Sequence, residues 1–148
     1  MESHGTQREP RITTRRFLDA QRSARLATVD GRGRPHVVPI VFVYDGHVVY
    51  TPIDRKPKTV APASLQRVRN IRSNPHVQVL VDHYDDDWTS LGYVQLRGTA
   101  SILEGGAEYR TAIGLLEAKY PQYRELPLAG CPLIRIIVER VVTWGEIG

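Results

Sequence analysis

The pattern of apolar and polar positions divides the chain into short runs with turn residues between them. Apolar residues at every second position are typical of a half-buried β-strand. Gly, Asp and Pro stand between several of these runs, as expected for the turns of antiparallel hairpins. The pattern predicts six strands, over residues 24–29, 35–44, 47–52, 76–83, 92–104 and 133–144.

Two of the predicted strands contain a residue that disturbs a regular ladder. Pro39 interrupts the run over residues 35–44. Because proline cannot donate a ladder hydrogen bond, it predicts an edge strand or a bulge. Gly98 lies inside the run over residues 92–104 and predicts a bend or bulge there.

Apolar residues at helical spacing predict three helices. A short helix begins near Thr13 or Thr14, and the others cover residues 62–72 and 107–120. Strands joined largely by short turns, with a few helices, favour a mainly β (α+β) protein: an antiparallel six-stranded barrel with flanking helices. We expect residues 1–12 to form a flexible N-terminal arm and residues 13–148 to form one domain.

Composition agrees with one globular domain. The chain has 148 residues, of which 41% are hydrophobic and 24% charged. No apolar run is long enough to span a membrane and no secretion leader is recognisable, so we expect a cytoplasmic protein. The single cysteine, Cys131, excludes an internal disulfide and is interpreted as a small buried residue.

The net charge of +4 is unevenly distributed. Residues 1–34 carry eight Arg against four acids, whereas the remaining residues carry twelve of each sign. Residues 55–81 contain no acid, and such a cationic surface attracts an anionic small molecule as readily as a phosphodiester backbone. Nucleic-acid binding is disfavoured because no helix-turn-helix, zinc-finger or RNA-stacking motif is present. The basic residues of this segment are Arg55, Lys56, Lys58, Arg67, Arg69 and Arg72.

The strand over residues 47–52 runs directly into the first three of these cations. Thr51 offers a hydroxyl, and Arg55, Lys56 and Lys58 offer charged donors within a few residues. This combination suits a phosphate group and fits no metal. The alternative is a solvated basic loop; we favour a cofactor phosphate.

Other chemistries have little support in the sequence. G-x-S-x-G, G-x-G-x-x-G and Walker motifs are absent, so no catalytic side chain is assigned. No metal site is predicted, although His83 with residues 85–87 could form a weak divalent-ion patch. Aromatic residues could line an apolar pocket, but such residues more often belong to the core. They are Trp88, Tyr93, Tyr120, Tyr123 and Trp144.

Five segments, in their order and spacing, resemble the pyridoxamine 5'-phosphate oxidase-like split β-barrel flavoprotein superfamily over about residues 13–146. They are RLATVDGRGRPH (25–36), YDG (44–46), YTPIDRKPK (50–58), RNIRSNPHV (69–77) and VQLRGTA (94–100). Two further segments are similar to its actinobacterial branch that uses the deazaflavin coenzyme F420, the flavin/deazaflavin oxidoreductase B group. They are DHYDDDW (82–88) and VTWG (142–145).

The resemblance implies a split β-barrel homodimer with two cofactor sites at the interface. It implies an F420-dependent oxidoreductase that transfers a hydride between the deazaflavin and a small conjugated organic substrate. FMN is the alternative cofactor, and a non-catalytic F420- or flavin-binding protein is the alternative function. Vitamin B6 oxidation is not expected, because the Arg-His segment that holds that substrate is missing. The proposed cofactor residues are Tyr50, Thr51, Pro52, Arg55, Lys56, Lys58, Arg72, Trp88, Tyr93 and Trp144.

Overall fold

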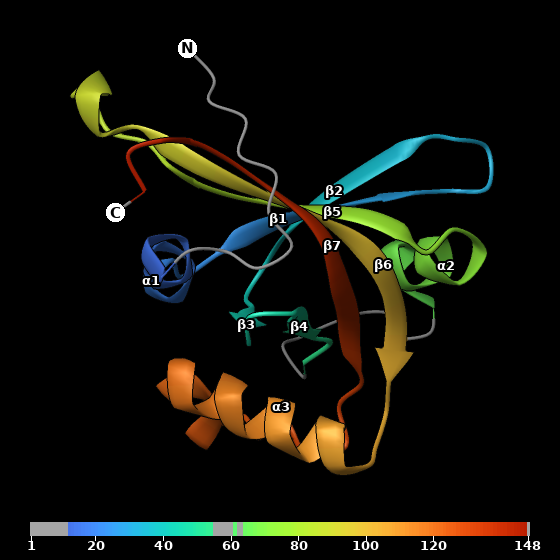
Figure 1. The fold of residues 1–148 in the computed structure, drawn as a ribbon. Helices are drawn as coiled ribbons and strands as arrows, with labels where there is room; N and C mark the ends of the chain where they lie inside the picture. The colour runs from blue at the N-terminus through green and yellow to red at the C-terminus, as the bar shows by residue number, and fades with distance from the viewer. Residues whose placement is uncertain (1–11, 55–60, 62–63, 148) are drawn as a thin grey trace.

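The computed structural model describes residues 12–54, 61 and 64–147. Over these residues the chain forms a seven-stranded antiparallel sheet in the order β2-β1-β5-β6-β7-β4-β3, with three α-helices around it (Figure 1). The strands are β1 (Ala24–Val29), β2 (Pro35–Ile40), β3 (Val43–Tyr44), β4 (Val48–Pro52), β5 (His76–His83), β6 (Gly92–Leu103) and β7 (Leu133–Gly145). The helices are α1 (Ile12–Ala20), α2 (Gln66–Ser73) and α3 (Ala107–Lys119), with 3-10 turns η2 (Trp88–Ser90) and η3 (Pro121–Arg124).

Chain connectivity forces the sheet to curl into a half-barrel. β2 and β3 lie at opposite ends of the strand order, yet only Val41 and Phe42 separate them in the chain. The two edges of the sheet must therefore approach each other at these two residues. Phe42 is fully buried, and its backbone N–H donates to the Tyr120 hydroxyl at 3.2 Å. The mainly β fold expected from the sequence is confirmed.

The count of six strands was one too low. The predicted strand over residues 35–44 is divided into β2 and β3, because the chain changes partner at residues 41 and 42. Ile40 pairs with Ala24 of β1, whereas Val43 pairs with Tyr50 of β4. A continuous apolar run carries no sign of this change. β2 is an edge strand, as Pro39 predicted.

Several local predictions are confirmed. β5 has the predicted bounds, and α1 and α3 agree with prediction to within a residue or two. The β6–β7 register shifts between Arg97 and Gly98, where a bulge was expected. A Cβ at Gly98 would lie 2.2 Å from the Ile137 carbonyl oxygen, so the two strands approach too closely for a side chain.

The buried apolar residues form two clusters. The main core fills the concave side of the sheet and includes Leu26, Phe42, Val79, Leu96 and Ile136. A second core joins β3 and β4 to α3, which lies beneath these strands in Figure 1. Cys131 is buried in this second core, as predicted.

Two cations that lie against aromatic rings connect the end of α3 to α1 and to the segment that follows α1. The Lys119 ammonium donates to the Leu18 carbonyl at 3.3 Å and lies 3.9 Å from the centre of the Phe42 ring. The Arg22 guanidinium donates to the Lys119 carbonyl at 2.8 Å and lies over Tyr120. Burial lowers the pKa of Lys119 to about 8.

None of the helices within the described ranges has the length and apolar content needed to cross a membrane.

Candidate functional site

The strand that was predicted to present the phosphate-binding segment is β4. Tyr50, Thr51 and Pro52 are buried at its end, where Thr51 pairs with Ile134 of β7. The three cations that follow, at positions 55, 56 and 58, lie outside the described residues. Their phosphate role therefore stays a prediction.

A buried carboxylate precedes the cationic segment. Asp54 is only 7% exposed and accepts a hydrogen bond from the Tyr123 hydroxyl at 2.8 Å. Burial and this hydrogen bond raise the pKa of Tyr123. Burial lowers the pKa of Arg67, while attraction to Asp54 opposes the shift. Asp54 was not predicted as a site residue, although a lone acid directly before three cations was a visible signal in the sequence.

Helix α2 carries the remaining cations and is anchored by a buried amide. Asn70 is 1% exposed, and its Nδ2 donates to the Thr28 hydroxyl of β1 at 2.9 Å. Its Oδ1 accepts from Gln66 Nε2 at 2.6 Å. Arg69 and Arg72 are exposed, and no acid occurs in the helix. Asn70 therefore fixes the orientation of a helix whose charged residues are all cations.

Of the five aromatic residues considered for a pocket, Tyr120 and Tyr123 are buried in the second core. The other three lie at the opposite end of β6 and β7. Tyr93 and Trp144 are directly opposite in the strand register, and their rings stack with centroids 5.6 Å apart and planes 25° apart. Trp88 lies in η2, between β5 and β6, and is 73% exposed. The Tyr93–Trp144 pair is an aromatic surface against which a planar ring could stack.

Arg72 lies on α2, and the other predicted site residues that the structure describes fall into two groups along β7. Thr51 pairs with Ile134 and Tyr93 pairs with Trp144, so ten residues of β7 separate the two groups. At roughly 3.3 Å per residue this is about 33 Å along the strand. Tyr50 has a packing role in the second core, where its hydroxyl donates to Glu108 Oε2 at 2.7 Å.

The possible divalent-ion patch near His83 is not formed. Within the described part of the chain, no group of three or more His, Cys, Asp or Glu side chains could hold a metal ion. The Asp85 and Asp87 carboxylates instead accept backbone N–H groups of the same turn, from Asp87 and Thr89.

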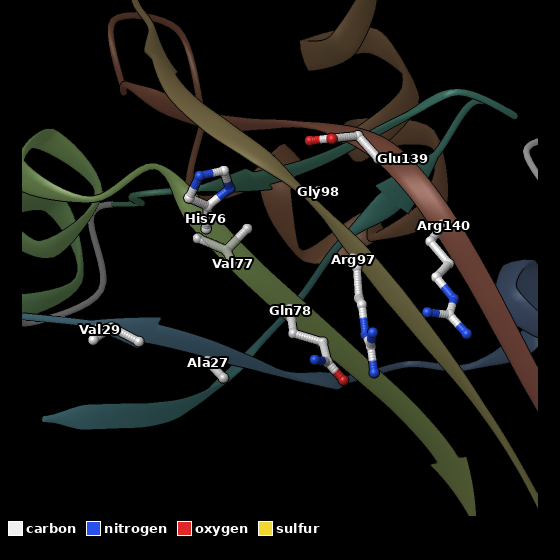
Figure 2. Close-up of a pocket in the computed structure, with 9 residues that line it drawn as sticks. All are labelled: Ala27, Val29, His76, Val77, Gln78, Arg97, Gly98, Glu139 and Arg140. Carbon is white, nitrogen blue, oxygen red and sulfur yellow. The ribbon is translucent and has the colours of Figure 1, made fainter. Parts of the chain in front are cut away.

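A groove that the sequence analysis did not predict lies on the outer face of the sheet. Its volume is about 550 Å³, and it crosses β1, β5, β6 and β7 at the bulge (Figure 2). In the sequence, Gly98 indicated the bulge but gave no other sign of the groove. The groove is lined by Ala27, Val29, His76, Val77, Gln78, Arg97, Gly98, Glu139 and Arg140.

Comparison with solved structures finds the same fold in proteins of low sequence identity. A FAD-binding protein from Mesorhizobium loti superposes with a TM-score of 0.68 at 21% identity, covering 95% of this chain and 96% of that one. A heme storage protein from Vibrio cholerae superposes with a TM-score of 0.69 at 21% identity, covering 88% and 92%. At this identity the likeness shows the fold alone.

Comparison of sequences identifies a nearer relative. A 5a,11a-dehydrotetracycline/5a,11a-dehydrooxytetracycline reductase from Streptomyces rimosus is 31% identical over 136 residues, which are 89% of this chain and 80% of the relative. The pyridoxamine 5'-phosphate oxidase family matches residues 12–145, the whole of the curled sheet with its helices. The chain therefore belongs to the pyridoxamine 5'-phosphate oxidase family of split β-barrel proteins.

Proposed function

We propose that this protein is an F420-dependent reductase that passes a hydride from the deazaflavin to a small conjugated organic substrate. Its family and its reductase relative support an oxidoreductase. The relative's substrate is named as a dehydro compound, which is consistent with reduction of a conjugated double bond. The observation that carries the proposal is the acid-free helix α2, anchored by Asn70 and preceded in the chain by the cations after β4.

The residues present fit a phosphorylated cofactor. Helix α2 contributes Arg67, Arg69 and Arg72. Asp54 is the one carboxylate close to the end of β4 in the chain; it accepts a hydrogen bond from the Tyr123 hydroxyl, and Arg67 attracts its negative charge. FMN carries one phosphate, whereas F420 adds a tail with several carboxylates. Six cations in residues 55–81 exceed the need of one phosphate, and this excess favours F420.

When bound, reduced F420 supplies the hydride, and the chain supplies binding, orientation and exclusion of water. In the proposal, Thr51, Arg55, Lys56 and Lys58 hold the phosphate and Arg72 holds the carboxylates of the tail. Guanidinium groups suit this role because they bind oxyanions through two parallel hydrogen bonds. The proton that accompanies the hydride comes from solvent or from a side chain.

The aromatic residues are proposed to contact the ring system and to shape the substrate opening. The Tyr93–Trp144 stack presents a flat apolar surface, and exposed Trp88 lies in the turn before β6. A planar ring over this stack would be shielded from water on one side.

The separation of the two groups of residues supports a homodimer. About 33 Å of β7 lies between Thr51 and Trp144, too far for both to border one ring and its adjoining phosphate within a single copy. A second copy related by two-fold symmetry would bring its own Tyr93–Trp144 pair to the phosphate end of the first. Two equivalent sites would then lie at the interface.

Titration of the purified protein with F420 and with FMN tests the cofactor choice. We expect tighter binding of F420; preferential retention of FMN would overturn this choice. The double variant Arg55→Ala/Lys58→Ala should lose at least about tenfold in affinity, because two charge-assisted contacts to the phosphate are removed. Arg32→Ala, at an exposed position of the β1–β2 turn, is the matched control. Unchanged affinity in the double variant would return the segment to an ordinary basic loop.

Turnover distinguishes an enzyme from a binding protein. Oxidation of reduced F420 can be followed by absorbance with a panel of enones, quinones and dehydrotetracyclines. Consumption of the reduced cofactor that depends on protein and acceptor supports the reductase. Tight binding without turnover across the panel would favour a cofactor-binding protein instead.

A further inference from the structure

The groove on the outer face of the sheet contains a like-charged cross-strand pair. Arg97 of β6 lies directly opposite Arg140 of β7. Figure 2 shows both side chains extending to the same side of the sheet, beside Gln78 of β5. Like charges directly opposite each other on neighbouring strands are destabilising. Folding therefore holds two guanidinium groups together against their repulsion.

The bulge is what creates this pairing. Gly98 pairs with Val138, so an uninterrupted register would place Glu139 opposite Arg97 and form an ion pair. The extra residue on β7 displaces Glu139 and brings Arg140 opposite Arg97 instead. Bulges occur frequently beside functional sites, where they redirect a side chain.

The two guanidinium groups are not neutralised by neighbouring acids. Glu139 is the one acid in the lining, and its carboxylate accepts the Thr99 hydroxyl. In Figure 2 this carboxylate points away from both arginines. Within the described ranges, neither guanidinium makes a side-chain hydrogen bond or ion pair with the protein. Both are exposed and available to a ligand.

The remainder of the groove is mixed in character. Ala27 and Val29 of β1 give it an apolar side, Val77 of β5 borders it from the main core, and His76, Gln78 and Glu139 are polar. Its volume of about 550 Å³ suits a small organic molecule. The arrangement therefore combines one strongly cationic end with an apolar wall. Two neighbouring guanidinium groups match the oxygen atoms of a carboxylate or a phosphate.

We propose that this groove binds a small organic anion, with its carboxylate or phosphate held by Arg97 and Arg140, its polar edge by Gln78 and its apolar body against β1. The site lies on the outer face of the sheet, and Arg140 lies six residues along β7 from the partner of Thr51. The assignment of this site depends on the strand register and the groove alone, and does not depend on the proposed cofactor.

Binding is tested on the full chain at low salt with 8-anilinonaphthalene-1-sulfonate. This probe joins a sulfonate anion to an apolar ring system, and its fluorescence reports binding. We expect saturable binding that Arg97→Gln/Arg140→Gln weakens by about tenfold or more. Arg25→Gln removes an exposed arginine of β1 outside the groove and should change the affinity less than about twofold. Equal weakening by both changes, or by neither, would overturn the site.

Competition identifies the anionic group. Benzoate and phenyl phosphate should displace the probe and neutral benzyl alcohol should not; the better of the two anions defines a carboxylate or a phosphate ligand. Displacement by benzyl alcohol as efficient as by benzoate would overturn an anion site.

A thermal measurement without any ligand gives a second readout. Arg140→Gln should raise the melting temperature by about 1–3 °C, because it removes the repulsion with Arg97. Arg140→Glu should raise it further by forming an ion pair with Arg97, and should abolish probe binding. A melting temperature that falls in both variants would show that Arg140 is held for stability rather than for a ligand.

Discussion

The buried hydrogen bond between Asn70 and Thr28 provides the sharpest test of how α2 is held. Both side chains are almost fully buried, and the Asn70 amide donates to the Thr28 hydroxyl at 2.9 Å. Thr28→Val removes the hydroxyl with little change of shape and leaves the amide without this acceptor. Asn70→Leu removes the amide and leaves the hydroxyl without its donor. An unsatisfied buried polar group costs about 1–3 kcal/mol, so each single variant should lose about 2 kcal/mol of unfolding free energy.

The double variant tests whether the loss of unfolding free energy comes from an unpaired buried polar group. With both partners apolar no buried polar group is left unpaired between them, so Thr28→Val/Asn70→Leu should be about 1–2 kcal/mol more stable than the sum of the single losses predicts. Urea unfolding measures this directly. With a slope of about 2 kcal/mol per molar, each single variant should shift the midpoint by about 1 M with the slope unchanged. Losses that add to within about 0.5 kcal/mol would refute the hydrogen bond as the anchor of α2.

Two further predictions concern the bulge and Lys119. Gly98→Ala should destabilise the protein by about 1–3 kcal/mol because its Cβ would meet the Ile137 carbonyl, whereas the control Gly114→Ala, at an open position of α3, should stabilise it by about 0.5–1 kcal/mol; thermal melts that rank the two equally would contradict the close strand approach. Burial lowers the pKa of Lys119 in the folded state to about 8 from its ordinary value of 10.5. The unfolded chain therefore binds more protons between these values, and the penalty for burying the ammonium is relieved as pH rises through this window. After allowance for solvent screening, the unfolding free energy of the wild type should rise relative to that of Lys119→Met by about 1 kcal/mol between pH 8 and pH 10. Chemical denaturation at a series of pH values measures this difference. A difference between the two proteins that does not change with pH would contradict the prediction.

Local features of the fold were readable in the sequence. The limits of β5, the helix α3 and the bulge at Gly98 were predicted because each depends on residues close together in the chain. Alternation identifies a strand, and a glycine or proline identifies its irregularities. The division of residues 35–44 into β2 and β3 was missed, because the run stays apolar while its hydrogen-bonding partner changes.

The candidate site was only partly readable for the same reason. The cationic segment after β4 is contiguous, so its composition alone predicted an anion site. The aromatic pair was a list of separate residues until the register placed Tyr93 opposite Trp144. The contact of Asp54 with Tyr123 joins residues far apart in the chain, and no periodicity indicates it.

The class of fold, the positions of most strands and the cationic segment after β4 follow from the amino-acid sequence alone. The placement of Thr51 and the Tyr93–Trp144 pair at opposite ends of β7, and of Arg97 opposite Arg140 rather than Glu139, follows only from the three-dimensional fold. A period of two assigns each residue to a face of the sheet, but not to a neighbour on another strand. The neighbour is set by packing and by one extra residue at the bulge, which depend on the whole sheet.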